Sequence, residues 1–381
     1  MKHVRTLAAL ATATLTAIAT VLAAPAQAQP EPGVVVDGLT DPWGLTPMKN
    51  GLVVTESGAG RVLTVNPDTG QVKVAVDGLA PYSAAGAAKI GRWFAIVTGE
   101  ADPSAPAGPF PGSSVLIAKR HGTPTVLADL LAHELENNPD GQTQFGEDGA
   151  PLDALSNPFS VIRAKGNHGF VLVADGGAND VLAVDRQGNV ETFFVPPTVN
   201  TGACEGLPNN DENTVGCDAV PTGLAYGPDG LYVSALTAEV PGEGRVYVVD
   251  PKTGDLIRTI TGFTAPTGVA VDKRDGTLYV SELLEGAPAG EPGPDFDPST
   301  VGQIVKVTPN GTRKAAQVTM PIGLVLDGST LYSTAWSVAG LFLGAEGLGQ
   351  VVSVPKKMFT QLTGDPARRP SGRAFSLRQF H

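Results

Sequence analysis

The sequence predicts an all-β protein, a six-bladed β-propeller with four-stranded antiparallel blades. Three observations support this prediction: a Pro-x-small-apolar element that recurs six times, the same order of strands after each copy, and an abundance of turn-forming residues. The 381-residue chain contains 47 glycines and 32 prolines without a collagen period. This composition indicates many tight turns and hence many short strands. A radial arrangement of repeats protects the edges that short antiparallel sheets would otherwise expose.

The recurring element marks the inner strand of each blade. Five copies are clear, and the first interval is about twice as long as the others, so Pro-Tyr-Ser-Ala at 81–84 supplies the sixth. The six copies are 42–45, 81–84, 158–161, 221–224, 266–269 and 321–324.

Two further strands follow each inner strand. The predicted second strands are 52–55, 94–97, 170–173, 231–234, 278–281 and 331–334. The predicted third strands are 61–65, 115–117, 181–184, 245–249, 304–307 and 351–354. Turn sequences such as Pro-Asp-Thr-Gly at 67–70 close most third strands into hairpins, and a weaker fourth strand completes each sheet. A β-sandwich, the alternative architecture, would not repeat one strand order six times.

The N-terminal strand is predicted to close the ring. Val-Val-Val-Asp-Gly-Leu at 34–39 resembles Val-Ala-Val-Asp-Gly-Leu at 74–79, the fourth strand of blade one. We therefore expect the first strand of the chain to complete the last blade.

One short helix is predicted within blade two, over residues 125–136. Its apolar face is formed by residues at helical spacing, and Pro139 ends the pattern. The residues on that face are Leu127, Leu130, Leu131 and Leu135.

The propeller is predicted to occupy residues 29–360, between two segments of different composition. Residues 1–28 contain early basic residues, an apolar run and a small-x-small site, the pattern of a secretory signal peptide that is cleaved after Ala28. A membrane anchor is the weaker alternative because threonines interrupt the run, and no later stretch is apolar enough to span a bilayer. Residues 361–381 form a basic tail that we expect to be disordered. We therefore predict a secreted protein.

The two cysteines, Cys204 and Cys217, lie in a polar stretch with little hydrophobic content. In an oxidising compartment they are predicted to form a disulfide that pins a surface loop. A loop of this size would gain about 3 kcal/mol in the chain-entropy model. A metal site would need more soft ligands than this pair offers.

The charge of the chain restricts its partners. The formal net charge is −12, and phosphate binding depends on Lys and Arg, so nucleic acid is excluded as a partner. Charged residues make up 17% and hydrophobic residues 42% of the chain, which suits a protein with a buried core. We expect a monomer whose partner is a small molecule or an extracellular protein.

Four acidic residues recur after the predicted second strands, at the face of a propeller where ligands usually bind. They are Glu56, Glu100, Asp175 and Glu282. Carboxylate oxygens suit calcium or magnesium far better than zinc or copper, so these residues are candidate metal ligands. The alternative is that they are solvated loop acids, or that they accept hydrogen bonds from backbone N–H groups.

Further polar and aromatic residues are predicted at the same mouth of the channel. Asp41 and Asn157 precede inner-strand prolines, and Asn179 lies in a loop between second and third strands. Trp336 could form an aromatic wall there together with Trp43, although tryptophans at such positions more often pack between blades. We predict Asp41, Asn157, Asn179 and Trp336 as ligand-binding residues.

Signatures of known catalytic sites are absent from the sequence. There is no Gly-x-Ser-x-Gly elbow, His-Glu-x-x-His motif, Walker loop or dinucleotide fingerprint. None of the five histidines occupies a repeat position that faces the channel. The sequence therefore assigns no catalytic residue, although acid/base chemistry by crowded carboxylates stays open.

Several stretches resemble the ScyD/ScyE family of exported bacterial proteins. They are 128–141, 156–159, 173–180 and 220–225. The resemblance implies export and a propeller fold but no established reaction. More distantly, the chain is similar to NHL, SMP-30/gluconolactonase and virginiamycin B lyase propellers. The lactonase group places acid and amide metal ligands at the channel mouth, which draws attention to Asp41, Asn157 and Asp175. The histidine on which the lyase relies has no counterpart here.

Three functions follow from these features. The first is a secreted propeller that binds a small molecule or a protein through its loops and has no established catalytic activity. The second is a calcium- or magnesium-dependent hydrolase or lactonase that uses the acidic mouth. The third is a structural component of the cell envelope.

Overall fold

The computed structural model describes residues 30–101, 108–166, 169–288, 290 and 292–362. The chain divides at Pro30 into a leading part and a compact unit that begins at Glu31, and the description below concerns the second unit. The predicted signal peptide lies outside the described residues, as does the predicted tail from residue 363 onward.

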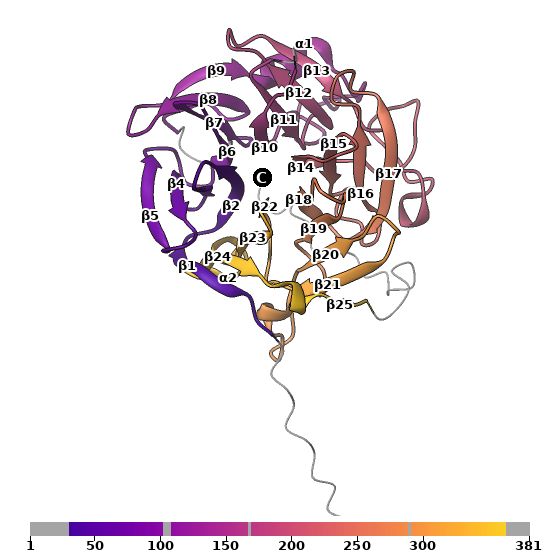
Figure 1. Ribbon diagram of the computed structural model, residues 1–381. Coiled ribbons are helices and arrows are strands. Elements are labelled where there is room, and N and C mark those ends of the chain that lie inside the picture. Colours follow the sequence, from indigo (N-terminus) through magenta and orange to yellow (C-terminus); the bar gives the residue numbers. More distant parts are fainter. Residues whose placement is uncertain (1–29, 102–107, 167–168, 289, 291, 363–381) are drawn as a thin grey trace, which may run out of the picture. The chain divides into compact units, whose positions relative to one another are not determined.

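Six antiparallel sheets are arranged around a central axis, as the sequence predicts (Figure 1). Blade one consists of β2 (Pro42–Met48), β3 (Gly51–Glu56), β4 (Arg61–Asn66) and β5 (Gln71–Val76). Blade two consists of β6 (Ala84–Ile90), β7 (Trp93–Thr98), β8 (Ser114–Lys119) and β9 (Thr125–Asp129). Blade three consists of β10 (Pro158–Arg163), β11 (Val171–Asp175), β12 (Asp180–Val184) and β13 (Val190–Phe194).

The other three blades repeat this order. Blade four consists of β14 (Pro221–Tyr226), β15 (Leu231–Ala235), β16 (Gly244–Val249) and β17 (Leu256–Phe263). Blade five consists of β18 (Pro266–Val271), β19 (Leu278–Glu282), β20 (Gln303–Val307) and β21 (Arg313–Gln317). Blade six consists of β22 (Leu324–Asp327), β23 (Thr330–Ala335), β24 (Gly349–Val354) and β1 (Gly33–Leu39).

The N-terminal strand closes the ring, which confirms the prediction. β1 pairs antiparallel with β24, with Gly33 opposite Ser353 and Leu39 opposite Gly349. The C-terminal side adds a strand that the sequence pattern did not reveal. β25 (Thr360–Gln361) pairs with β21 and makes blade five a five-stranded sheet.

Steric crowding around the axis explains why the third position of the recurring element is a small residue. Inner strands of neighbouring blades contact one another around the axis. A Cβ atom on Gly44 would lie 2.9 Å from Cα of Gly86 in blade two, and a Cβ atom on Gly323 would lie 2.5 Å from the carbonyl oxygen of Trp43. At these two positions only glycine allows the backbones to approach this closely, and the equivalent residue of blade three is the small Ser160. The small residue is therefore a packing requirement of the ring.

The predicted copy of the element at 81–84 is wrong by three residues. The strand β6 begins at Ala84, which lies opposite Thr98 as Pro42 lies opposite Glu56. Gly86 is therefore the residue equivalent to Gly44. Blade two has no proline at this place, so the pattern pointed to Pro81 instead.

The predicted helix of blade two is shorter than expected. Residues 125–129 form the fourth strand of the blade, β9, and the helix α1 covers only Leu130–Asn137. Asp129 ends the strand and caps the helix, because its side chain accepts a hydrogen bond from the N–H of Ala132. The predicted apolar face is also wrong. Leu130 and Glu134 are buried, whereas Leu135 is 47% exposed.

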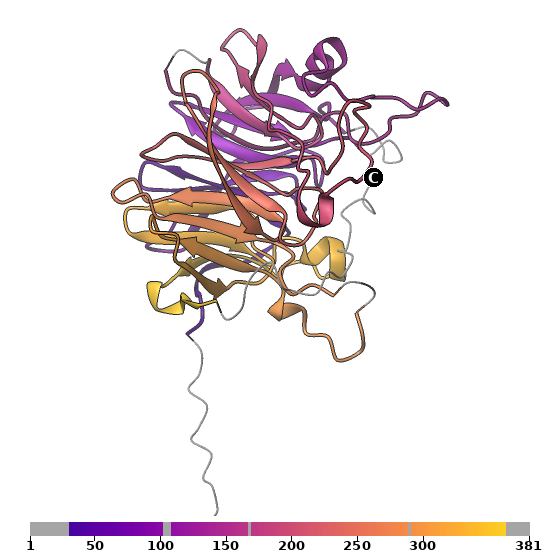
Figure 2. The ribbon, with the colours of Figure 1, turned by 90° about the vertical axis from the view of Figure 1, so that its right-hand side faces the viewer.

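The remaining short helices are α2 (Ala339–Leu343), η1 (Gly202–Cys204), η2 (Pro298–Thr300) and η3 (Lys356–Met358). In the side view α1, η1, α2 and the loop before η2 project from one side of the ring (Figure 2). We call this side the loop face. There the inner strands begin and the second strands end. The opposite side, where the inner strands end in tight hairpins, is the hairpin face. In the described residues no helix combines the length and apolarity needed to cross a membrane.

Candidate functional site

The carboxylates at the ends of the second strands form hydrogen bonds with the loops that precede the inner strands. Glu56, Asp175 and Glu282 end β3, β11 and β19, and each is at most 3% exposed. Each accepts a hydrogen bond from a backbone N–H of the entering segment. The donors are Thr40 at 3.0 Å, Asn157 at 2.6 Å and Thr264 at 2.9 Å, respectively.

Asp175 is the most heavily hydrogen-bonded of these carboxylates. It also accepts bonds from the hydroxyl of Ser156 at 2.6 Å and from the N–H groups of Gly177 and Ala178. Burial raises the pKa of Asp175, and these hydrogen bonds oppose that effect. Such contacts give the carboxylate a structural role in the turn between β11 and β12.

Glu100, the fourth predicted metal ligand, occupies a different kind of position. It lies two residues beyond β7 and is exposed. Its backbone N–H donates a hydrogen bond to the side-chain oxygen of Asn157 at 3.1 Å. The four predicted ligands belong to four different blades. Among the residues that the structure describes, no group of three or more His, Cys, Asp or Glu side chains is arranged to hold a metal ion. Calcium or magnesium binding by these four residues stays a prediction.

Asp41, predicted to bind a ligand, anchors helix α2 to blade one. Its two carboxylate oxygens accept hydrogen bonds from the N–H groups of Gly340 at 2.8 Å and Leu341 at 3.2 Å. The side chain is 1% exposed, and burial raises its pKa. Burial, reinforced by the charge of Asp41, raises the pKa of neighbouring Tyr82 to about 12. Asp41 thus joins segments about 300 residues apart in the chain.

Trp336 lies mainly among apolar neighbours. It is partly buried and packs against a cluster that includes Met320, Ile322 and Val338. Trp43 is stacked on Phe159, with ring centroids 6.1 Å apart, and its indole N–H donates to the carbonyl oxygen of Ser337 at 2.9 Å. The tryptophans thus tie blade six to the inner strands of blades one and three.

The structure brings Glu100, Asn157 and Asn179 together in one pocket on the loop face. This loop-face pocket has a volume of about 550 Å³ and lies between blades two, three and four. The side-chain oxygens of Asn157 and Asn179 accept hydrogen bonds from the N–H groups of Glu100 and Val220, at 3.1 Å in both cases. The two amides therefore link the loops that form the pocket wall.

Sequence reasoning missed most of the acidic lining of this pocket. Besides Glu100, the wall contains Asp153, Asp218 and Glu239, and no Lys, Arg or His belongs to the described lining. Apolar side chains, among them Phe159 and Leu236, complete it. The three missed acids lie in irregular loops, where no repeat position identifies them. The position of Asp218 directly after Cys217 was the one local signal in the sequence.

The predicted disulfide supports one wall of the loop-face pocket. Cys204 and Cys217 are bonded, with their Cα atoms 5.4 Å apart, which confirms the prediction. Asp218 follows directly, and its carboxylate accepts hydrogen bonds from the side-chain amides of Gln142 and Asn209, both at 2.6 Å. The disulfide loop therefore fixes the position of an acid that lines the pocket.

The rim of the loop-face pocket has an unusual backbone. Three consecutive residues that are not glycine, Thr237, Ala238 and Glu239, have positive φ angles of 54°, 47° and 60°. Ala238 and Glu239 line the pocket. Strained backbone of this kind costs free energy and is concentrated at functional sites. Other loops of the same face have single residues of this kind, such as Asp41 and Trp336, whereas this rim has three in a row.

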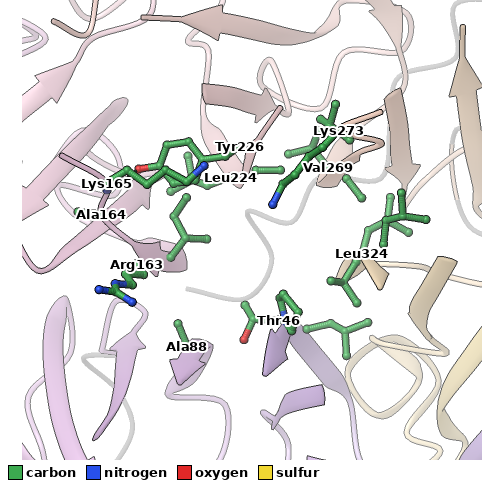
Figure 3. A pocket seen from close by; sticks show the side chains of 18 of the residues that line it. Thr46, Ala88, Arg163, Ala164, Lys165, Leu224, Tyr226, Val269, Lys273 and Leu324 are labelled. Atoms are coloured by element: carbon green, nitrogen blue, oxygen red, sulfur yellow. Dashed lines mark hydrogen bonds between the residues drawn. The ribbon is translucent and has the colours of Figure 1, made fainter. Parts of the chain in front are cut away.

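A second pocket opens at the other end of the channel, on the hairpin face (Figure 3). Its volume is about 580 Å³. Four basic residues, Lys89, Arg163, Lys165 and Lys273, belong to its lining, and no Asp or Glu does among the described lining residues. We call it the basic mouth. Its walls come from the ends of the inner strands and are otherwise largely apolar.

Comparisons with known proteins show a likeness in fold and none in sequence family. No family model matches the sequence, and no curated protein matches it either. The resemblance to the ScyD/ScyE family therefore stays a prediction. Among solved structures, the neighbours include a regucalcin, a gluconolactonase and an aldose sugar dehydrogenase.

Three neighbours illustrate the likeness. A calcium-binding regucalcin from Agrobacterium tumefaciens is 12% identical, with a TM-score of 0.50 over 84% of this chain and 93% of that one. A gluconolactonase from Xanthomonas campestris is 14% identical, with a TM-score of 0.50 over 84% and 88%. An aldose sugar dehydrogenase from Streptomyces coelicolor, solved with PQQ, is 12% identical, with a TM-score of 0.51 over 86% and 99%. At these identities the likeness shows the fold alone.

Proposed function

We propose that the protein is exported and binds a small organic cation with an apolar part in the loop-face pocket. The observation that carries this proposal is the composition of the pocket wall: four carboxylates, two amides and several apolar side chains, without a basic residue in the described lining. A pocket of about 550 Å³ is large enough for a small ligand.

The charge of the pocket selects the ligand class. Glu100, Asp153, Asp218 and Glu239 add their negative potential over a concave surface, where low-dielectric walls strengthen the field. An ammonium group would be attracted to this potential, and the apolar part of the ligand would contact Phe159 and Leu236. An anion of the same size would be repelled. The hydrogen bonds of Asn157 and Asn179 keep the wall in place before any ligand arrives.

Titration calorimetry with matched pairs of ligands tests this proposal. Phenethylamine and hexylamine would be compared with the neutral phenethyl alcohol and hexanol. We expect the amines to bind, with an affinity that falls as salt increases, and the alcohols to bind much more weakly. Glu100→Gln should weaken amine binding by about tenfold, corresponding to a charge-assisted contact of about 1.4 kcal/mol. Glu191→Gln, an exposed acid on β13, is the matched control and should bind like the parent protein.

Two results would count against an amine-binding pocket. One is that neither amine binds at low salt. The other is that Glu100→Gln and Glu191→Gln bind amines equally well. Export is tested separately by fractionation of the producing cells, since the proposal requires the mature chain in the medium. Retention in the wall fraction would favour the structural envelope component instead.

The alternative function is a calcium- or magnesium-dependent lactonase that uses the same pocket. Its support is the presence of oxygen donors in the wall and a fold in common with proteins described as gluconolactonases. The described residues do not fit a metal centre as they stand, because no three His, Cys, Asp or Glu side chains among them are arranged to hold an ion. We therefore derive no catalytic step through a metal. Hydrolysis of a lactone panel, with Ca²⁺ or EDTA and in Glu100→Gln, decides the question, and absence of metal-dependent turnover would end this alternative.

A further inference from the structure

Blade three departs from the other blades at the start of its third strand. In blade one Glu56 lies opposite Arg61, whose guanidinium is 2.5 Å from the carboxylate. In blade five Glu282 lies opposite Gln303, whose amide donates to it at 2.6 Å. In blade three Asp175 lies opposite Asp180. In blade three a second carboxylate therefore occupies the position at which blades one and five have a hydrogen-bond donor, Arg61 and Gln303.

The two turns show how closely the positions correspond. Both acids begin a turn of the same length, Glu-Ser-Gly-Ala-Gly-Arg at 56–61 and Asp-Gly-Gly-Ala-Asn-Asp at 175–180. Gly60 and Asn179 have positive φ angles of 61° and 50° at the equivalent place. The backbone is thus alike, and the side chain at the last position differs in charge. Opposite residues of an antiparallel pair lie on the same face of the sheet, so the carboxylates of blade three are neighbours.

Asp180 is buried without a hydrogen-bond donor. Its residue exposure is 0%, and neither carboxylate oxygen has a partner among the described residues. Asp175 cannot supply one, because it accepts four hydrogen bonds itself. An ionised carboxylate in such surroundings costs several kcal/mol unless an opposite charge compensates it. A positive charge from outside these protein groups, either a proton or a bound cation, must therefore neutralise the carboxylate of Asp180.

Helix α1 adds further oxygen atoms that lack a donor. Glu134 is 3% exposed. Its Oε1 atom accepts from Gln144 at 2.8 Å, whereas Oε2 is buried without a partner. Asn138, which caps the end of the helix, donates its amide to the carbonyl oxygen of Gln142 and leaves Oδ1 buried without a donor. Glu134 and Asn138 are four residues apart and so lie on one side of the helix end.

The end of α1 is in contact with the β11–β12 turn. Asp140, which follows the helix, accepts a hydrogen bond from the side chain of Asn179 at 3.1 Å. Burial raises the pKa of Asp180 well above its usual value, and the charges of Asp175, Glu134 and Asp140 raise it further. In the described part of the chain no ion pair joins Asp175, Asp180 or Glu134 to a basic residue.

We propose that Asp180, Glu134 and Asn138 bind a Ca²⁺ ion between helix α1 and blade three. The ion takes the place that the guanidinium of Arg61 occupies in blade one. Carboxylate and amide oxygens are its preferred ligands, and its flexible coordination suits an irregular site better than the strict octahedron of Mg²⁺. None of the three residues lines the loop-face pocket, so this inference is independent of the proposed function.

Calcium titration of the EDTA-treated, full-length protein at about pH 8 tests the site, because both acids should then favour ionisation in the presence of a cation. We expect Ca²⁺ to raise the melting temperature in proportion to the logarithm of its concentration, and Mg²⁺ to raise it less. Asp180→Asn should lower the affinity for Ca²⁺ by more than about tenfold. Its melting temperature in EDTA should equal or exceed that of the parent, because a neutral amide removes the buried charge.

Two controls make the outcome decisive. Glu100→Gln removes an acid of the loop-face pocket and should keep the full response to Ca²⁺. Glu134→Gln repeats the test if Asp180→Asn fails to fold. The proposal is overturned if Ca²⁺ leaves the melting temperature of the parent unchanged, or if both site variants respond as the parent does. In that case protons neutralise the two acids. An equal response to Mg²⁺ and Ca²⁺ would overturn the assignment to calcium.

A separate observation concerns the basic mouth on the hairpin face. In a chain of net charge −12, Lys89, Arg163, Lys165 and Lys273 line a single opening. Figure 3 labels the last three of these residues. None of the ion pairs within the described residues involves them. The ammonium group of Lys165 lies 3.9 Å from the ring centroid of Tyr226. Burial lowers the pKa of Lys165, and the charge of Lys273 lowers it further. The cations thus repel one another without an acid between them.

The interior behind this opening is apolar. Leu45, Ile162, Leu224, Val269 and Leu324 come from five different inner strands and line both this pocket and the channel that continues from it. We infer that the basic mouth binds an amphipathic anion, with its carboxylate or phosphate among the cations and its apolar part directed into the channel. Charge and apolar contact together define this ligand class.

Three probes separate the sources of such a ligand. Decanoate and decyl phosphate carry an apolar chain, and inorganic phosphate does not. We expect at least one of the first two to bind in a salt-dependent manner and inorganic phosphate to bind much more weakly. The double substitution Lys165→Gln and Lys273→Gln should weaken binding by about tenfold or more, whereas Lys314→Gln, an exposed lysine on β21, should not. Absence of binding by all probes, equal binding by inorganic phosphate, or an unchanged double variant would each overturn the inference.

Discussion

Glu134 should make the metal-free protein less stable as the pH rises. Its pKa is raised from 4.5 to about 7, first by burial and then by the charges of Asp140, Asp175 and Asp153. An acid whose pKa is higher in the folded state binds more protons there than in the unfolded state. Stability is therefore fully present below about pH 4.5 and is lost as the pH rises through about 7.

The size of this effect follows from the two pKa values. A difference of about 2.5 pKa units corresponds to about 3 kcal/mol, a large part of the stability of an ordinary domain. Most of the loss falls between about pH 5 and pH 8. Glu134→Gln has no proton to lose and still has an oxygen for Gln144. It should remove this part of the pH dependence.

Urea unfolding in EDTA at several pH values measures the effect. The slope of unfolding free energy against pH should be smaller in Glu134→Gln than in the parent protein, while exposed Glu136→Gln, on the same helix, should leave the slope unchanged. Equal slopes for the parent and Glu134→Gln would show that Glu134 keeps an ordinary pKa and would refute the account of the buried acids. Saturating Ca²⁺ should reduce the difference, because the bound ion favours the ionised carboxylate.

Three further perturbations test the fold and its supports. Gly323→Ala should cost several kcal/mol or prevent folding, because its Cβ atom would lie 2.5 Å from the carbonyl oxygen of Trp43, and soluble yield with near-UV circular dichroism reports this. Glu56→Gln should lower stability by about 1 to 3 kcal/mol in urea unfolding, because it breaks the pair with Arg61. Amine binding should be unchanged in that variant, and loss of binding without loss of stability would give Glu56 a role at the site. The double substitution Cys204→Ser and Cys217→Ser should lower stability by about 3 kcal/mol and weaken amine binding through Asp218, whereas unchanged binding would separate the disulfide from the pocket.

Local patterns were sufficient for the architecture of this protein. The small residue of the element recurs because the inner strands pack closely around the axis, as Gly44 and Gly323 show. The copy predicted at 81–84 was wrong, because in blade two the small residue is Gly86 and no proline marks the strand. The match between residues 34–39 and 74–79 predicted the closing strand, since both segments form equivalent outer strands. The helix boundary was wrong because the residues of β9 also fit a helical spacing. Residues 125–129 form a strand and not a helix because they pair with β8, and the local sequence does not encode this pairing.

The candidate site was predictable only in part. Glu56, Asp175 and Glu282 were found by their repeat position at the ends of the second strands. Asn157 and Asn179 lie in the lining of the loop-face pocket, and their role as ligand-binding residues stays a prediction. Asp153, Asp218 and Glu239 come from irregular loops whose courses are set by a disulfide and by side-chain hydrogen bonds. No period in the sequence could identify them.

Sequence alone established the repeat, the closing strand and the pairing of the two cysteines, because each depends on residue types at regular spacing or on a simple count. Tertiary structure decided which carboxylates are paired, which are buried alone and which line a pocket. Asp41 meets α2 across almost the whole chain, and Asp180 is packed near Glu134 of the preceding blade's helix. The charge state and the partner of a carboxylate depend on atoms that come together only when the ring has closed.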